Sequence, residues 1–376
     1  MIYLDNAATS WPKPPSVKET VAQAFDYAAN PGRGAHQLAM KSAREVFKVR
    51  EKIKDLINAE STKNIAFTKN CTEGLNIAMF GSLQAGDHVI TSVYEHNSIL
   101  RPLHVLEERG VDLDILDCPI DDLADNILRA IKPNTRMVAI SHVDNLVGRV
   151  KDIKKIGNSL SRDILFLVDA AQSIGHMPID VEEARIDLLA APGHKALMGP
   201  MGTGFLYVRD ETAVLPFMVG GTGSRSQSLV HPDFAPDKYE AGTENLHGIV
   251  GLGAGIDWIN EVGIENIEAH VKDLAKTFYR LVKDMPGVIV YGIESDDQIT
   301  SIVSLNISDR DSAEVAMALD REGEVAVRSQ MHCAPLSHKH FHTLDQGMVR
   351  FSFGYFNTMD EVHEAAKILE KIIQDN

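Results

Sequence analysis

The chain has 376 residues, of which 44% are apolar and 24% charged, a length and composition that can bury a large core. It has 37 Lys and Arg against 53 Asp and Glu, and a net charge of −16 argues against nucleic acid as a main partner. Three widely spaced cysteines suggest no disulfide framework and fit a reducing, cytoplasmic setting. MIYLDNAATS at the start lacks a basic and then apolar leader, so we expect neither export nor membrane insertion.

FTKNCTEGLNIAMFG at 67–81 is the first informative stretch and predicts a strand that enters a helix near Asn70. Free N–H groups at a helix start, with the Thr72 hydroxyl and the neighbouring Cys71, would bind a phosphate. Helix capping alone would explain the same residue types, so both interpretations stay open.

Short apolar runs then alternate with segments typical of helices. Strands are predicted at 88–94, 137–143 and 164–171, with another within 111–118. This alternation predicts an α/β fold with a mostly parallel sheet flanked by helices. Ligands bind beyond the C-terminal ends of such strands, where His96 follows the first strand; an isolated histidine there is either structural or catalytic.

The run FLVDAAQSIGH places Asp169 directly after a strand and Gln172 three residues later. A carboxylate there could hold a protonated ring nitrogen in its cationic form, or could cap a helix. LLAAPGHKALMGPMGTGFLYV follows at 188–208, with His194 and Lys195 between a strand and a glycine-rich turn. Lys195 could form a covalent adduct or be a surface lysine, and the glycine order does not match a phosphate-binding P-loop.

Residues 248–285 have apolar residues at helical intervals and are expected to link two domains. Strands at 288–292, 300–308 and 349–354, with a helix at 311–323, predict a smaller α+β unit. We therefore expect a large domain at 16–255 and a small C-terminal domain at 256–376 that includes residues 1–15.

VAVRSQMHCAPLSHKHFHTL places Cys333 in a loop beside His332 and near Arg328. Nearby cations would favour the reactive thiolate, although a buried, inert cysteine is common. The histidines of this loop could instead bind zinc, but their alternation is a poor fit to zinc-site spacing, and we expect no metal.

Taken together, these segments resemble the class V aminotransferase-like pyridoxal-phosphate enzymes of fold type I, in particular the cysteine desulfurase and selenocysteine lyase family. The likeness extends from YLDNAATS to VRFSFGYFNT, and DAAQSIGH followed by PGHKALMGPMGTG is its most specific part. It implies a seven-stranded sheet in the large domain and pyridoxal 5'-phosphate as cofactor.

The resemblance also implies roles for individual residues. Lys195 would hold the cofactor covalently, Asp169 would pair with the ring nitrogen, and Gln172 would bind the ring hydroxyl. His96 would stack on the ring and assist proton transfer as a catalytic residue. The remaining implied cofactor contacts are the phosphate ligands Cys71, Thr72 and His194, and Thr243 from the other subunit of a homodimer. Asn145, Arg350 and Arg33 would bind the substrate, and Cys333 would accept its sulfur. Pro192 departs from the family, because many desulfurases have a serine there.

We therefore predict a cysteine desulfurase that converts L-cysteine to L-alanine and leaves a persulfide on Cys333. L-selenocysteine lyase activity would use the same residues. An aminotransferase or a C–S lyase without a persulfide is a further alternative, as is a binding module without cofactor. The persulfide would pass to a sulfur or selenium acceptor that the sequence does not identify.

Overall fold

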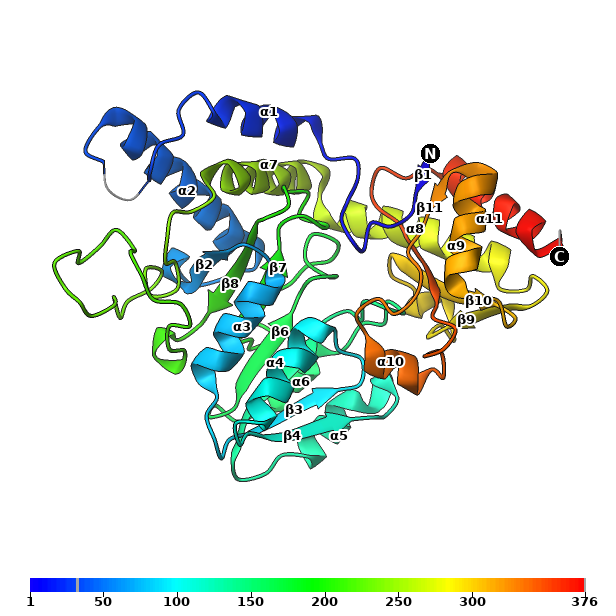
Figure 1. Ribbon diagram of the computed structural model, residues 1–376, viewed down its shortest axis with the longest axis horizontal. Helices are drawn as coiled ribbons and strands as arrows, with labels where there is room; N and C mark the ends of the chain where they lie inside the picture. The colour runs from blue at the N-terminus through cyan, green and yellow to red at the C-terminus, as the bar shows by residue number, and fades with distance from the viewer. Residues whose placement is uncertain (32–33, 375–376) are drawn as a thin grey trace.

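The computed structural model describes residues 1–31 and 34–374, and its largest element is a seven-stranded sheet in the order β2-β8-β7-β6-β5-β3-β4 (Figure 1). Neighbouring strands from β7 through β4 are parallel, whereas β8 runs antiparallel to both β7 and β2. The strands are β2 Ile65–Thr68, β3 His88–Ser92, β4 Asp112–Leu116, β5 Thr135–Ser141, β6 Leu165–Asp169, β7 Leu188–Pro192 and β8 Gly204–Val208.

Helices cover both faces of this sheet, as the alternating sequence pattern predicts. One buried cluster packs α2 and α7 on one face, and a second packs α3 and α4 on the other. The helices are α1 Pro15–Ala24, α2 Gln37–Leu56, α3 Cys71–Ser82, α4 Asn97–Glu107, α5 Leu123–Arg129, α6 Ile153–Ser159 and α7 Leu246–Val262. The predicted α/β class and mostly parallel sheet are confirmed.

The C-terminal part forms a separate, smaller core around the antiparallel sheet β12-β10-β9. The first strand of the chain also belongs to this core, because β1 pairs with β11 and Leu4 packs among the C-terminal residues. The elements are β1 Ile2–Tyr3, α8 Ile264–Val282, β9 Val288–Tyr291, β10 Ile302–Ile307, α9 Ser312–Gly323, β11 Val325–Ala326, α10 Pro335–His340, β12 Val349–Ser352 and α11 Met359–Gln374.

The predicted linking helix is two helices, α7 and α8, which meet at Gly263. The φ of Gly263 is 88°, a left-handed conformation that ends α7 and that side chains disfavour. Ile256, Ile259 and Ile267 still pack in the core of the large sheet, whereas Leu274 belongs to the C-terminal core. The boundary at 255/256 stays a prediction, and this packing would move it into α8.

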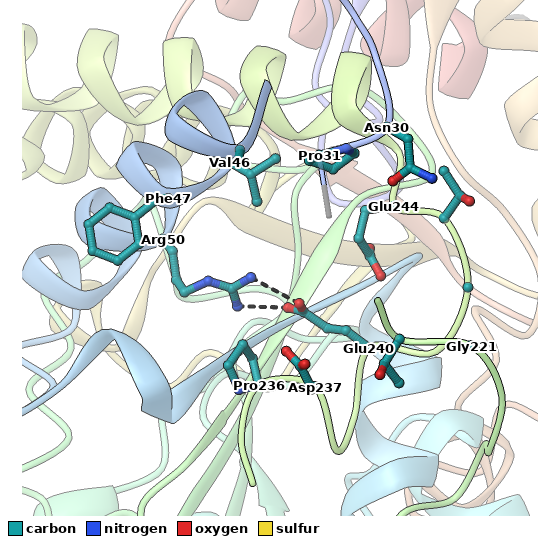
Figure 2. A pocket seen from close by; sticks show the side chains of 14 residues that line it. Asn30, Pro31, Val46, Phe47, Arg50, Gly221, Pro236, Asp237, Glu240 and Glu244 are labelled. Carbon is teal, nitrogen blue, oxygen red and sulfur yellow. Dashed lines mark hydrogen bonds and ion pairs between the residues drawn. The ribbon is translucent and has the colours of Figure 1, made fainter. Parts of the chain in front are cut away.

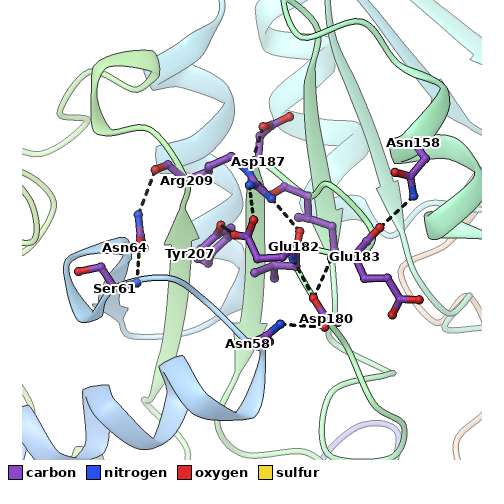
Figure 3. Close-up of polar contacts among 12 residues, drawn as sticks. Asn58, Ser61, Asn64, Asn158, Asp180, Glu182, Glu183, Asp187, Tyr207 and Arg209 are labelled. Carbon is purple, nitrogen blue, oxygen red and sulfur yellow. Dashed lines mark hydrogen bonds and ion pairs between the residues drawn. The ribbon is translucent and has the colours of Figure 1, made fainter.

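Figure 3 shows a polar network at the opposite end of the sheet from the site described below. Arg209, just after β8, pairs with Glu182 and donates to the carbonyl of Ile186. Asp187, just before β7, accepts the N–H of Phe166 at 2.9 Å. These contacts fasten the loops at that end. None of the described helices combines the length and apolar composition needed to span a bilayer.

Candidate active site

A cavity of about 220 Å³ lies beyond the C-terminal ends of the central parallel strands. Three strands end in its wall: β5 at Ser141, β6 at Asp169 and β7 at Pro192. Residues of the C-terminal core close it from the other side, among them Arg328 and Arg350. The site therefore lies where ligands are expected in an open α/β sheet.

Asp169 is 4% exposed and presents its two carboxylate oxygens to different surroundings. Oδ1 accepts the N–H of Ala171 at 2.8 Å and the thiol of Cys71 at 3.3 Å. Oδ2 accepts no hydrogen bond from the described part of the chain. Burial raises the pKa of Asp169, while the Ala171 N–H, the charge of Lys195 and the Cys71 thiol oppose the rise. The chain continues into a turn, so Asp169 is not a helix cap.

Lys195 follows β7 in a turn that the N-terminal segment of the chain holds in place. The Ser10 hydroxyl donates to the Lys195 carbonyl at 2.7 Å, and the Lys13 ammonium donates to the His194 carbonyl at 2.6 Å. Burial, helped by the charge of Arg350, lowers the pKa of the Lys195 amine to about 8. That amine makes no hydrogen bond within residues 1–31 and 34–374, so it is a half-buried nucleophile without a fixed partner.

His96 serves two purposes, since it caps α4 and lines the cavity. Its Nδ1 accepts the N–H of Ser98 at 3.0 Å, which leaves Nε2 free to hold the proton. Burial and the charge of Lys195 lower the pKa of His96 to about 4, so the ring is neutral at pH 7. The Ser98 hydroxyl also contacts the Thr72 hydroxyl at 2.8 Å, which links α4 to the start of α3.

The start of α3 has the features of an anion site. Asn70 caps the helix by accepting the N–H of Glu73 at 2.9 Å. The first N–H groups of a helix have no partner inside it, and those of Cys71 and Thr72 stay unpaired in the described chain. Both residues line the cavity. Asn70 performs the capping, and anion binding, the other alternative that the sequence left open, would use different groups of the same helix end.

Arg350, in β12, is 2% exposed and reaches the cavity from the C-terminal core. Its Nη1 donates to the Asn145 carbonyl at 2.7 Å and its Nη2 donates to Asp5 at 3.2 Å, while Nε is buried and has no acceptor in the part of the chain that the structure describes. The Asn145 amide donates to the His332 carbonyl at 2.9 Å, and its oxygen, an acceptor, has no donor among the described residues. The free Nε donor of the Arg350 guanidinium suits a carboxylate ligand, whereas Asn145 could donate to one only through its NH₂ group.

Most of the predicted site residues meet in this one wall. Those that line it are Cys71, Thr72, His96, Asn145, Asp169, Gln172, His194, Lys195 and Arg350. Cys333 is half-buried one residue outside the wall, next to His332. Arg33 lies outside the described residues.

Thr243 is exposed and lies away from this wall, in the lining of a second cavity of about 460 Å³. Figure 2 shows that cavity, in which Arg50 and Glu240 form a two-pronged ion pair at 2.7 and 2.9 Å. Burial and the charge of Glu240 raise the pKa of the adjacent Glu244 to about 7. Within one chain, Thr243 is thus separated from the other predicted cofactor ligands.

Two basic residues of the wall were not predicted as ligands of cofactor or substrate. Arg328 and His332 were interpreted as cations near Cys333, and His332 also as a possible zinc ligand, yet both line the cavity. His332 is 3% exposed, and burial together with the charge of Arg350 lowers its pKa well below the ordinary value, so its ring is neutral. Arg328 pairs with Arg350 through a β-bridge, and this pairing would have identified Arg328 as a wall residue. The sequence alone does not show which strands pair.

The sequence profile of the family described as Aminotransferase class-V matches residues 2–364. This chain belongs to that family. Curated class-V relatives are similar over their whole length: a probable cysteine desulfurase of Methanothermobacter thermautotrophicus is 39% identical, with 99% of this chain and 94% of the relative covered. A probable cysteine desulfurase of Pyrococcus abyssi is 35% identical, with 100% and 94% covered.

Solved structures agree with this class-V assignment. A cysteine desulfurase from Thermococcus onnurineus, solved in its apo form, has a TM-score of 0.94 at 32% identity and covers 100% of this chain and 95% of its own. A cysteine desulfurase from Escherichia coli has a TM-score of 0.87 at 28% identity, with 99% and 94% covered. The family and the fold expected from DAAQSIGH and PGHKALMGPMGTG are confirmed.

Proposed function

We propose that this protein is a pyridoxal-phosphate-dependent cysteine desulfurase that converts L-cysteine to L-alanine. The observation that supports this most is that one wall holds both the Lys195 amine and Asp169 Oδ2, neither of which makes a hydrogen bond to the described residues. Two curated relatives are named as probable cysteine desulfurases, and the solved structure from Thermococcus onnurineus, which has the same fold, is named as a cysteine desulfurase.

The donor set of the cavity fits the cofactor. The N–H groups of Cys71 and Thr72 at the start of α3 would hold its phosphate, together with His194. Asp169 Oδ2 would accept from the ring nitrogen, the neutral His96 ring would stack on the pyridine, and Gln172 would bind the ring hydroxyl. When bound, the cofactor supplies an electron sink for the substrate α-carbon.

The residues of the chain supply binding and proton transfer. Arg350 and Asn145 would bind the substrate carboxylate and fix which bond of the α-carbon lies against the cofactor. The Lys195 amine, with its pKa of about 8, would take the α-proton onto Nζ. Asp169 would keep the ring nitrogen protonated, which strengthens the electron sink.

Cys333 would accept the sulfur. Its thiolate forms a bond to the sulfur of the substrate while the Cβ–S bond breaks, and the electron pair stays on the substrate carbon. That carbon takes up a proton to become the methyl group of alanine, and the enzyme keeps a persulfide. Selenium would follow the same route. An external thiol or acceptor protein must then remove the persulfide, and the three free cysteines fit a reducing cytoplasm.

A homodimer is part of this proposal. Thr243 would reach the phosphate site of a second copy, which agrees with its separation from Lys195 within one chain. Large apolar side chains are exposed on the segment before it, where a second copy would cover them: Leu215, Phe217, Val219, Leu229 and Val230.

The direct test supplies the purified protein and pyridoxal phosphate with L-cysteine or L-selenocysteine and measures alanine with released sulfide or selenide. Alanine formed from neither substrate would refute the proposal. Replacing Cys333 with Ala should abolish sulfide release while borohydride still fixes the cofactor to Lys195. Normal activity of that variant would favour a lyase or an aminotransferase instead.

A further inference from the structure

The side chain of Cys71 contacts Asp169, the predicted partner of the ring nitrogen. Cys71 is the first residue of α3, is 8% exposed and lines the cavity, whereas Cys333 lies just outside the wall. Its Sγ is 3.3 Å from Asp169 Oδ1. The Ala171 N–H donates to the same oxygen at 2.8 Å, so Oδ1 has two donors and Oδ2 has none in the described chain.

The surroundings of Cys71 keep it a thiol. Burial raises its pKa well above the ordinary value, and the charge of Asp169 raises it further, although Lys195 opposes the effect. A protonated thiol is a hydrogen-bond donor and a poor nucleophile. Cys71 can therefore donate to Asp169 throughout the neutral range without competing for substrate sulfur.

We propose that Cys71 is a positioning residue whose thiol donates to Asp169 Oδ1 and so turns Oδ2 toward the ring nitrogen of the cofactor. This inference rests on the proposed function. It gives Cys71 two separate contributions, since its backbone N–H faces the phosphate site and its side chain faces the carboxylate.

The contact has an electronic consequence. Asp169 and the ring nitrogen would share one proton, and each hydrogen bond donated to the carboxylate stabilises its ionised form. The Cys71 thiol therefore favours the proton on the ring, where it strengthens the electron sink. Loss of the thiol would shift the proton toward Asp169 and slow α-proton removal.

The contact itself can be tested without cofactor. Iodoacetamide labelling of the cofactor-free protein, resolved by mass spectrometry, gives the alkylation rate of Cys71 at pH 8. Asp169→Asn removes the charge that helps burial to raise the Cys71 pKa, so labelling should become severalfold faster as the thiolate fraction rises. Gln172→Ala opens the same cavity without removing that charge and is the matched control. Equal labelling rates in the two variants would overturn the proposal.

The functional consequence is tested in the loaded enzyme. Cys71→Ala should lower kcat about three- to tenfold with KM changed less than about twofold, because only a weak donor to a charged group is lost. Cys71→Ser restores a donor and should recover at least about half of the activity. Cys118→Ala alters a half-buried cysteine outside the cavity wall and should be neutral. An alanine variant as active as the unaltered enzyme would refute the positioning role.

These outcomes are separable from failure of the proposed function. If borohydride fixes no cofactor to Lys195 in the unaltered protein, the proposed function fails while the labelling rates still decide the thiol–carboxylate contact. If the cofactor is fixed and the Ala and Ser variants behave alike, the positioning role alone fails.

Discussion

The carbonyl oxygen of Cys333 accepts a hydrogen bond of 2.8 Å from the backbone N–H of Asn97, the residue after His96. The segment predicted to accept sulfur is thereby fastened to the helix whose cap faces the cavity. Cys333, His332 and Gln330 all have positive φ, at 57°, 46° and 71°, which costs backbone energy and needs such external support.

Asn97→Pro removes that N–H and little else. Asn97 is the first residue of α4, where proline is favoured, and His96 already has the extended φ and ψ of −70° and 154° that a following proline requires. We expect sulfide release to slow about three- to tenfold, as the loss of one hydrogen bond allows, with unchanged attachment of the cofactor to Lys195. Asn97→Ala keeps the N–H and is the control; equal rates for both variants would contradict the anchoring role.

The reactivity of Lys195 should depend on pH. Because its pKa is lowered to about 8, the amine is mostly protonated at pH 7 and becomes nucleophilic as the pH rises through 8. The rate at which pyridoxal phosphate attaches to cofactor-free protein, followed by absorbance, should rise nearly tenfold per pH unit and level off above about pH 8.

Asp169→Asn should move that midpoint down, because the charge of Asp169 raises the Lys195 pKa. The Asp169→Asn protein would then have more neutral Lys195 amine at pH 7 and would attach the cofactor faster, even if it binds the cofactor less tightly. A midpoint near 10.5 in the unaltered protein, the ordinary value for a lysine, would contradict the lowered pKa of Lys195.

Arg350→Lys tests carboxylate binding. The guanidinium is held by the Asn145 carbonyl and Asp5, and lysine cannot reproduce its planar fork. We expect KM for L-cysteine to rise about 10- to 100-fold, the range for a lost charged hydrogen bond. Cysteamine, which lacks the carboxylate, is the control ligand: its binding, measured as a change in cofactor absorbance, should hardly change. An equal loss for both compounds would indicate general damage to the site.

A buried ion pair supports the same wall. Lys151 and Glu95 are both fully buried at 3.1 Å, and Glu95 also accepts the N–H of Ser141 at 2.6 Å. Lys151→Met leaves the buried Glu95 carboxylate without its counter-charge and should lower the free energy of unfolding by about 3–5 kcal/mol. Adding Glu95→Gln should recover part of that loss in urea denaturation of the cofactor-free protein. Additive losses would show that the pair is not coupled.

The sequence by itself determined the α/β class and most strand positions, and it predicted residues that the structure brings together in one cavity wall. The apolar runs that end at Asp169 or precede His96 predict both a strand and a polar residue at its end. A sequence pattern can show this because the strand and that polar residue are neighbours in the chain. The motif DAAQSIGH, followed along the chain by the motif that contains Lys195, was also enough to indicate the family.

Tertiary structure alone decided the rest. The antiparallel direction of β8 depends on how the turn after Lys195 folds back. The entry of Arg328 and His332 into the wall depends on strand pairing within the C-terminal part, where Arg328 pairs with Arg350. The Cys71 contact with Asp169 joins residues 98 positions apart. Sequence patterns report short-range periodicity, whereas hydrogen bonds between distant segments form only when packing brings their atoms within about 3 Å.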